Sequence, residues 1–513
     1  MVFEQKIMMG KTAAGEAAVL SPSMANRHGL IAGATGSGKT VSLKVMAEGF
    51  SALGVPVFLS DVKGDISGMA QAGTANEKVE ERISSMGLEG FAFSDYPVTF
   101  WDVYGRTGIP LRTTISEMGP LLLSRILNLT NVQSDVLSVV FKIADDENLL
   151  LIDTKDLKAM LAYVSERSKE YEAEYGKLSG QSLAAITRSV VALEAEGGDQ
   201  FFGEPALSVA DWFTTDRSGR GMMHILDASS LIQSPRLYAA FLLWLLSELF
   251  ELLPEVGDLA FPKMVFFFDE AHLLFSDAPK VLLEKVEQVV KLVRSKGVGI
   301  YFCTQNPADI PGGILSQLGN KVEHALHAYS PAEQKGVRTI AQSYPVNPAF
   351  DTYEAILSLG TGEAVVSFLG EDGVPSQAAK VRILPPQSAM TALDGALRET
   401  CVKGSVLYAK YASAVDPESA YEFLQRRGME RAEAEAGAKQ AQAAQKEAER
   451  EAKAAQKAAE KEAKAAERAA QREAERQERA RKQAIKSVGS TVAGTVGREV
   501  GKQVGKSMGS FGK

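Results

Sequence analysis

Short apolar runs alternate with longer segments whose apolar residues recur at helical spacing through most of the chain. Several of these runs end in an acidic or amide residue, as buried parallel strands do at their carboxyl ends. The predicted strands are Gly29–Ala32, Val55–Asp61, Val98–Asp102, Gly221–Asp227, Met264–Asp269 and Gly299–Gln305. Strands that alternate with helices predict a mostly parallel, three-layer α/β sheet. Residues 1–25 predict an edge strand or hairpin, and Lys321–Ala328 and Glu363–Leu369 predict further edge strands.

From Ser116 to Glu196 the pattern becomes purely helical, with apolar residues three and four positions apart. We therefore expect an all-helical insertion over residues 111–205, which divides the α/β core into residues 1–110 and 206–425. The most apolar run, Tyr238–Leu253, contains two glutamates and is shorter than the roughly 20 residues that span a bilayer. It predicts a buried core helix.

Residues 426–486 consist almost entirely of Ala, Glu, Lys, Arg and Gln. Similar eleven-residue repeats begin at Lys446, Lys457 and Arg468, a period of about 3.67 residues per turn that predicts one long, nearly straight helix. Alanine is a poor coiled-coil core residue, which favours a solvated helix or a weak bundle over a tight coiled coil. Residues 487–513 form a Gly-rich basic tail, for which flexibility, self-association and contact with a membrane surface remain open.

Charge is distributed unevenly along the 513 residues, whose formal net charge is −8. The part from Arg426 onward has 21 basic and 13 acidic residues, so its net charge is +8 and that of the preceding part is −16. An acidic core is not typical of a general nucleic-acid binder, although bulk charge does not reveal a local basic lining. Two cysteines and an N-terminus without an apolar signal core predict a reduced, cytoplasmic protein.

The stretch GATGSGKT lies between the strand Gly29–Ala32 and the helical segment Val41–Phe50. Strand, glycine-rich loop and helix in this order are what a phosphate-binding P-loop requires, because its backbone N–H groups and the helix N-terminus face the anion. Lys39 would reach the β- and γ-phosphates of a nucleotide, and the Thr40 hydroxyl would bind Mg²⁺. The predicted nucleotide-binding residues are Gly33, Ala34, Thr35, Gly36, Ser37, Gly38, Lys39 and Thr40.

Acidic and amide residues follow two later strands. Asp269 ends the run Val265–Phe268 and is placed as a Walker B acid that holds Mg²⁺, while Glu270 is placed as the general base that polarises the attacking water. Gln305 ends the following strand, where it could contact the γ-phosphate or the water, or be a satisfied strand-end amide. The polar turn Asp61–Asp65 lies at the same predicted edge, where its acids could line the nucleotide or only form the turn.

The set GATGSGKT, FFFDEAH and TQNP resembles the HerA/FtsK superfamily of ring-forming translocases. The segments DVKGDISG and YPVTFWDVYGRTGIPLRTT, with the helical insertion, are similar to the bacterial HerA-like family of the YjgR type. The resemblance covers residues 1–425. It implies a RecA-like core, ATP and Mg²⁺, and a hexameric ring with ATP sites between subunits. It also implies that Arg294, and less strongly Arg27, act in the neighbouring subunit's site. The residues before Gly33 are too few for the β-barrel of archaeal HerA, which puts the DNA-end and nuclease docking of that barrel in doubt.

Three functions remain open at this stage. The first is an ATP-driven motor that translocates double-stranded DNA or acts like a helicase. The second is an ATPase that remodels or docks a protein partner through the C-terminal helix, or is part of a membrane-associated assembly, although direct contact with the membrane surface is disfavoured. The third is a nucleotide-dependent scaffold with little turnover. The sequence leaves the polymer, the direction of movement, the ring size and the helix's partner undetermined, because fold alone does not determine function.

Overall fold

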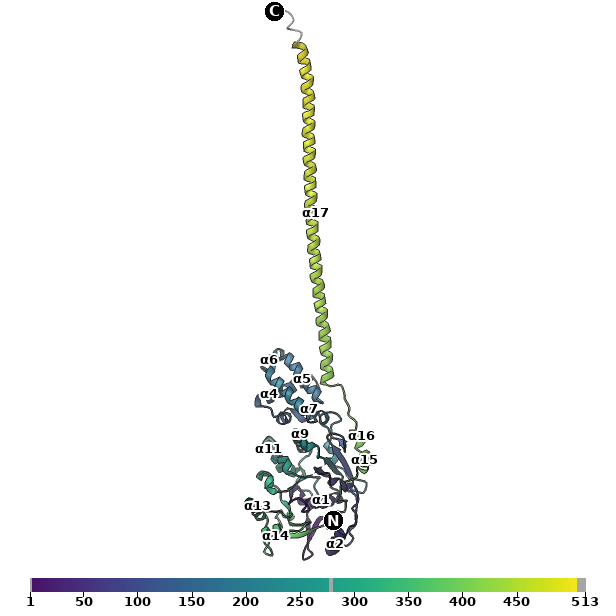
Figure 1. Ribbon diagram of the computed structural model, residues 1–513, viewed down its shortest axis with the longest axis vertical. Helices are drawn as coiled ribbons and strands as arrows, with labels where there is room; N and C mark the ends of the chain where they lie inside the picture. The colour runs from purple at the N-terminus through teal and green to yellow at the C-terminus, as the bar shows by residue number, and fades with distance from the viewer. Residues whose placement is uncertain (1, 276–279, 505–513) are drawn as a thin grey trace, which may run out of the picture. The chain divides into compact units, whose positions relative to one another are not determined.

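A computed structural model describes residues 2–275 and 280–504, with side chains given for 2–275 and 283–487. The chain forms two compact units, Met1–Gln425 and Arg426–Lys513. The first unit holds the sheet and the helical segments that cover it, and the described residues of the second form one continuous helix (Figure 1). Each unit is described by itself.

The first unit is built on a thirteen-stranded sheet in the order β1-β2-β13-β12-β11-β4-β10-β9-β5-β8-β6-β7, with β3 paired to β2. The strands from β11 to β7 are mutually parallel, and the others are antiparallel. The parallel strands are β4 (Gly29–Ala32), β5 (Val57–Asp61), β6 (Val98–Asp102), β7 (Ile109–Pro110), β8 (Met223–Asp227), β9 (Met264–Phe268), β10 (Val298–Thr304) and β11 (Asn320–Glu323). The antiparallel strands are β1 (Val2–Phe3), β2 (Lys6–Thr12), β3 (Ala17–Leu20), β12 (Glu363–Ser367) and β13 (Ala379–Ile383).

Helices cover both faces of the sheet. One apolar core contains Phe50 of α1 (Lys39–Ala52) and Phe267 of β9, and a second contains Phe268 and residues of α9 (Pro235–Leu252) and α11 (Lys280–Val293). Because side chains alternate along a strand, adjacent residues such as Phe267 and Phe268 enter opposite cores. The predicted three-layer, RecA-like α/β core is therefore confirmed, with the P-loop strand β4 and the acid-bearing strand β9 on either side of β10.

The predicted insertion is helical and shares the core of α9 rather than forming a core of its own. Capping boxes begin α3 and α4 at Thr114 and Thr130, which satisfies backbone N–H groups at their first turns. The helices of this segment are α3 (Ile115–Ile126), α4 (Asn131–Asp146), α5 (Thr154–Glu166), α6 (Ser168–Tyr175), α7 (Gly180–Ala195) and α8 (Gly198–Phe201). Those outside it include α2 (Glu77–Ser85), α10 (His272–Phe275), α12 (Gly312–Leu315), α13 (Pro331–Gln342), α14 (Thr352–Ser358), α15 (Gly395–Gly404) and α16 (Tyr408–Tyr411).

The sheet edge near the N-terminus differs in part from the prediction. The first 25 residues form the expected hairpin, β2 and β3. The strand predicted over Lys321–Ala328 ends at Glu323, however, because the next residues turn toward the P-loop. The strand β13 lacked a recognised signal, and it joins β12 to β2.

Residues 385–419, here called the strap, follow β13 and connect the sheet to the last helix. The strap crosses α1, where the carboxylate of Glu48 accepts hydrogen bonds from the N–H groups of Gln387 (2.9 Å) and Ser388 (3.0 Å). The Lys44 ammonium, one turn earlier on α1, donates to the carbonyl of Ala389 at 2.9 Å. The strap is therefore attached to the helix that begins at the P-loop.

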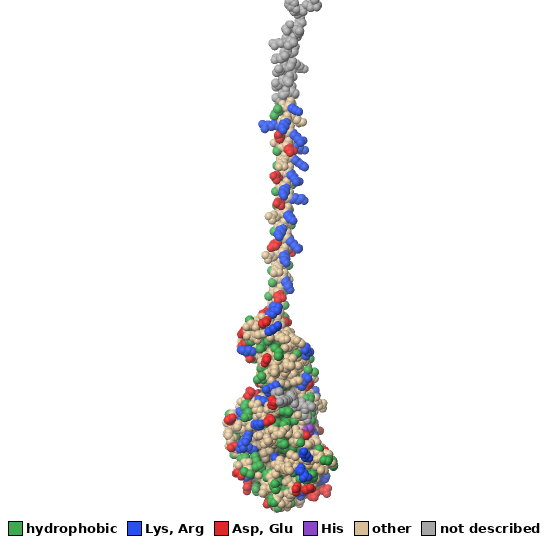
Figure 2. All heavy atoms as spheres, turned by 90° about the vertical axis from the view of Figure 1, so that its left-hand side faces the viewer, with side chains coloured by type: hydrophobic (Ala, Val, Ile, Leu, Met, Phe, Trp, Pro, Cys, Tyr) green, Lys and Arg blue, Asp and Glu red, His purple; other side chains and the backbone are tan. Residues whose placement is uncertain are grey.

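The last helix, α17, runs from Ala420 to Val504 without a break. At 1.5 Å per residue its 85 residues are about 130 Å long. All its side chains from Met429 to Ser487 are exposed, and Figure 2 shows Lys and Arg side chains along one side of it. The predicted long helix is confirmed and extends into the Gly-rich tail, of which residues 505–513 lie outside the described part. In the described residues no helix combines the length and apolarity needed to cross a bilayer.

Candidate active site

The loop between β4 and α1 has the backbone conformation of a phosphate cradle. Gly33, Gly36 and Gly38 have φ angles of 146°, 77° and 118°, which L-amino-acid side chains disfavour. A Cβ on Gly33 would also lie 2.5 Å from the Cβ of His324. The Lys39 ammonium bends back over the loop and donates to the carbonyl oxygens of Gly33 (2.7 Å) and Ala34 (3.1 Å). It is therefore poised over the predicted phosphate site.

Residues far along the chain hold the loop in place. His324 lies with Nε2 2.8 Å from Oγ of Ser42 on α1 and Nδ1 2.8 Å from the carbonyl oxygen of Glu363. That carbonyl only accepts, so Nδ1 carries the proton and Ser42 donates to Nε2. Burial lowers the pKa of His324 to about 4, which keeps the ring neutral. No local pattern in the sequence indicates this role for His324, because nothing there shows that the end of β11 reaches α1.

Asp269 follows the carboxyl end of β9, which β10 separates from the P-loop strand β4. It is buried, and its Oδ2 has no hydrogen-bond partner among the described residues. Burial, followed by the charge of Glu270, raises the pKa of Asp269 to about 7. A buried carboxylate oxygen with an open acceptor fits a divalent cation, which would compensate its charge. Thr40, in the first turn of α1, is the second residue whose type and place fit Mg²⁺.

Glu270 is held by contacts to three side chains. Lys63 donates to Oε1, while Gln305 Nε2 donates to Oε2 at 3.1 Å and His272 Nδ1 lies 3.2 Å from Oε2. Burial by itself raises the pKa of Glu270, but the hydrogen bonds from Lys63 and Gln305 outweigh it and lower that pKa overall. The backbone of Glu270 has a φ of 48°, an uncommon conformation for a residue other than glycine. Such strain is typical of functional sites.

Gln305 connects the P-loop to the acidic pair. Its Oε1 accepts a hydrogen bond from the Thr35 hydroxyl at 3.2 Å, and its Nε2 donates to Glu270. The strands β4 and β10 are neighbours in register, with Thr304 opposite Ala32, so the residues after them meet at one edge. The structure thus brings the P-loop, Glu270 and Gln305 together, as the sequence predicted for this edge.

The turn after β5 resolves the alternatives left open for Asp61. The Asp61 carboxylate accepts from the backbone N–H groups of Gly64 (2.7 Å) and Ile66 (3.2 Å), so it forms the turn. The residue that reaches the candidate site is Lys63, which belongs to no motif recognised in the sequence. Its only signal was its place in a polar turn at the carboxyl edge of the sheet.

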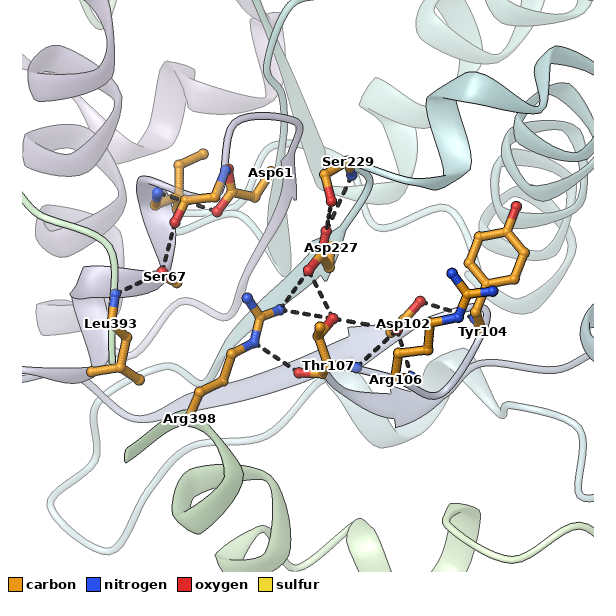
Figure 3. Close-up of polar contacts among 12 residues, drawn as sticks. Asp61, Ser67, Asp102, Tyr104, Arg106, Thr107, Asp227, Ser229, Leu393 and Arg398 are labelled. Carbon is orange, nitrogen blue, oxygen red and sulfur yellow. Dashed lines mark hydrogen bonds and ion pairs between the residues drawn. The ribbon is translucent and has the colours of Figure 1, made fainter. Parts of the chain in front are cut away.

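The same edge continues away from the nucleotide half as a second polar cluster (Figure 3). Asp227 of β8 lies opposite Asp61 and accepts hydrogen bonds from Thr107 (2.7 Å) and Arg398 of α15 (3.0 Å). Asp102 of β6 accepts from the backbone N–H of Thr107 at 2.9 Å. These acids have partners within the strap and their own loops, so this cluster fastens the strap to the sheet.

Arg27 and Arg294 lie at the amino ends of β4 and β10, whereas the P-loop follows the carboxyl end of β4. Arg27 precedes β4 and forms an ion pair with Asp258 at 3.5 Å, while Arg294 precedes β10, and its carbonyl accepts from Asn26 at 3.3 Å. The four residues of β4 alone put about 13 Å between this edge and the P-loop. The side chain of Arg294 is exposed. The two arginines are therefore close to each other and away from the P-loop of their own chain.

The arrangement could bind a nucleoside triphosphate and position a water molecule against its γ-phosphate. Lys39 and the P-loop amides would hold the phosphates, Asp269 and Thr40 the cation, and Glu270 the water.

Known proteins resemble parts of this chain. The DNA double-strand break repair helicase HerA of Sulfurisphaera tokodaii is 33% identical over 109 residues, and that of Sulfolobus acidocaldarius is 31% identical over 111 residues. Each match spans 21% of this chain and 21% of the relative's own length. Among solved structures, VirB4 of Thermoanaerobacter pseudethanolicus has a TM-score of 0.47 and 16% identity over 74% of this chain and 96% of that one. The unbound bacterial conjugative coupling protein TrwB has a TM-score of 0.46 and 14% identity over 77% and 93%.

A family sequence model gives the broadest match. It covers residues 6–513, including the P-loop, the Asp269–Glu270 pair and Gln305. The chain therefore belongs to the family described as Helicase HerA-like C-terminal.

Proposed function

We propose that this protein is an ATP-hydrolysing motor that moves along double-stranded DNA. The observation that carries the proposal is the continuous hydrogen-bonded series from Thr35 through Gln305 to Glu270, next to the Lys39 ammonium. A structural P-loop would not require an amide and a buried acid arranged around its phosphate position. Membership of the HerA-like family supports the same reading.

In this proposal each residue has one task. The P-loop amides bind the phosphates, and the Lys39 ammonium leaves the Gly33 carbonyl for the β- and γ-phosphate oxygens. Glu270 accepts a proton from the attacking water, and Gln305 orients that water or the γ-phosphate. Asp269 and Thr40 would hold Mg²⁺, which would neutralise charge on the β- and γ-phosphates.

Arg294 and Arg27 are proposed to complete the site of a neighbouring copy. They lie too far from their own P-loop to contact its nucleotide, and they are close together at one edge. A closed ring of identical subunits would place this edge against the next subunit's P-loop edge, since head-to-tail contacts close into rings. A hexamer is the ring size implied by the resemblance of the motifs to ring-forming translocases.

Double-stranded DNA is the polymer favoured by the relatives. Both curated relatives bear the name DNA double-strand break repair helicase, although each match covers only 21% of their length. The test is the ATPase rate of the full chain with and without linear double-stranded DNA, alongside its native mass. We expect DNA to raise the ATPase rate and the Glu270→Gln substitution to abolish ATP hydrolysis. A Glu270→Gln variant that hydrolyses ATP normally would contradict the role given to Glu270, and little ATP turnover by the parent protein would favour the scaffold.

A protein partner is the second candidate, and the exposure of α17 favours it. The side chains of this helix from Met429 to Ser487 are exposed to solvent, so they are available to contact a partner. Two results together would favour the protein partner over DNA. The first is ATP turnover that is insensitive to DNA. The second is a truncated protein without residues 426–513 that keeps its ATP turnover but loses its function in cells.

A further inference from the structure

The candidate general base contacts other side chains through both of its oxygens. Oε1 of Glu270 accepts from Lys63, and Oε2 contacts Gln305 and His272. A charged donor on Oε1 makes the carboxylate a weaker base, because it stabilises the ionised form. Glu270 would therefore be a stronger base toward water once the Lys63 contact is exchanged.

Lys63 is the partner most able to leave. Its side chain is 43% exposed, whereas Glu270 is 3% exposed, so the lysine can move into solvent and the glutamate cannot. An ammonium on a flexible stem is also free to change acceptors, unlike the Gln305 amide, which is fixed by Thr35.

The turn that carries Lys63 does not depend on its ammonium group. The Asp61 carboxylate accepts two backbone N–H groups of the turn, and the Ser67 hydroxyl donates to the carbonyl of Gly64 at 2.6 Å. The Lys44 ammonium donates to the carbonyl of Asp65 at 2.7 Å. Because these contacts determine the shape of the turn, the Lys63 side chain is available for another task.

Lys39 and Lys63 lie close enough to each other and to Glu270 for their charges to interact. Lys39 covers the P-loop, while Lys63 contacts Glu270, which Gln305 links to Thr35 of the same loop. The γ-phosphate of a bound triphosphate would lie between these side chains. Lys39 would bind the β- and γ-phosphates, and Glu270 would contact the attacking water beyond them. Carboxylate and phosphate oxygens both accept charge-assisted hydrogen bonds from an ammonium, so the γ-phosphate would offer Lys63 an alternative acceptor.

We propose that Lys63 is a γ-phosphate sensor: its ammonium group pairs with Glu270 when the site lacks a triphosphate and transfers to the γ-phosphate when ATP binds, which releases Glu270 to act as the base. This inference rests on the proposed ATPase function. It makes Lys63 a positioning residue for Glu270 and a binding residue for the γ-phosphate. ADP, which has no γ-phosphate, leaves the Lys63–Glu270 pair in place.

The test compares binding of a non-hydrolysable ATP analogue with binding of ADP to the full-length protein. Lys63→Gln should weaken binding of the analogue by about tenfold or more, because one charged hydrogen bond is lost. The affinity for ADP should remain nearly unchanged. Lys63→Arg should restore most of the analogue affinity. Lys142→Gln, which removes an exposed lysine paired with Asp146 on α4, is the matched control and should change neither affinity.

A double-mutant cycle tests the exchange itself. Glu270→Gln should increase the affinity for the analogue, because Lys63 then has no charged partner to leave. This gain in affinity should vanish in the double variant, in which Lys63 is also replaced by glutamine. Equal losses of ADP and analogue affinity in Lys63→Gln would show a purely structural role and overturn the proposal. The same gain from Glu270→Gln in both backgrounds would overturn it as well. If Lys39→Ala also binds both nucleotides normally, the proposed ATPase function fails with it, so the two failures are distinguishable.

Discussion

The carboxylate of Glu48 accepts a hydrogen bond from the backbone N–H of Ser388 at 3.0 Å, across 340 positions of sequence. Glu48 is on the helix that begins at the P-loop, and Ser388 is in the strap that leads to α17. The carboxylate is buried, with the Lys44 ammonium one turn away. This contact fastens the strap to the helix that begins at the P-loop.

Glu48→Ala is expected to destabilise the first unit. The substitution leaves the N–H groups of Gln387 and Ser388 without their acceptor, and each buried donor left unsatisfied costs about 1–3 kcal/mol. Chemical denaturation of the full chain measures the loss. Glu48→Gln keeps an acceptor and should lose less, and a Glu48→Ala protein as stable as the parent would contradict the role given to this contact.

Stability should fall in acid because His324 is buried and neutral. Burial lowers its pKa to about 4 from 6.5, so below pH 6.5 the unfolded chain takes up a proton that the folded chain does not. The contribution of His324 is complete above pH 6.5 and declines by about 1.4 kcal/mol per pH unit toward pH 4.

Denaturation midpoints of the parent and of His324→Gln, measured from pH 7 to pH 4, test this slope. The advantage of the parent should shrink as the pH falls. The exposed His327 offers a control, since His327→Gln should leave the slope unchanged. A constant difference between the parent and His324→Gln over this range would show that the ring is not neutral in the folded protein.

Lys39→Ala is expected to abolish nucleotide binding or hydrolysis while leaving the fold intact. The ammonium group contacts only loop carbonyls in this structure, at 2.7 and 3.1 Å, so its main work would be to bind phosphate. Calorimetric titration with ATP and a turnover assay measure the effect. Normal turnover in this variant would refute the assignment of the site.

Arg294→Ala is expected to lose turnover but retain ATP binding, because the guanidinium group lies at the edge of the sheet away from its own P-loop. Mixing this variant with Lys39→Ala subunits should restore part of the activity. In a mixed ring, an intact P-loop of one variant can meet the intact arginine of the other. If mixtures stay inactive, Arg294 acts within its own chain or has no catalytic role.

A chain that ends after Gln425 should keep the thermal stability of the first unit, because residues 426–513 form a separate compact unit. A chain that ends after Glu418 should be less stable. It lacks the Ser419 hydroxyl and the Tyr421 N–H, which donate to the buried Asp156 carboxylate at 2.6 and 2.8 Å. Equal melting temperatures of the two truncated proteins would show that this start of α17 adds nothing to the fold.

Much of the site was predictable because its signals are local. The glycines of the P-loop adopt φ angles that their own positions require, and apolar runs ending in Asp269 or Gln305 are typical of buried strands at a ligand-binding edge. The roles assigned to the site residues, those of Arg27 and Arg294 among them, remain predictions, as do the hexamer and the partner of α17. The ending of β11 at Glu323 was mispredicted, since apolar residues continue beyond it although the backbone turns to the P-loop.

The sequence by itself determined the phosphate-binding loop, the acidic pair, the alternation of strands and helices, and the long charged helix. Each depends on torsional preferences or apolar periodicity within a short stretch of chain. Tertiary structure decided the rest. Lys63 meets Glu270 across 207 positions, and Ser388 meets Glu48 across 340, only because the order of strands and the path of the strap bring them together. No local pattern encodes such pairs, since their free energy arises from burial and charge shared between distant segments.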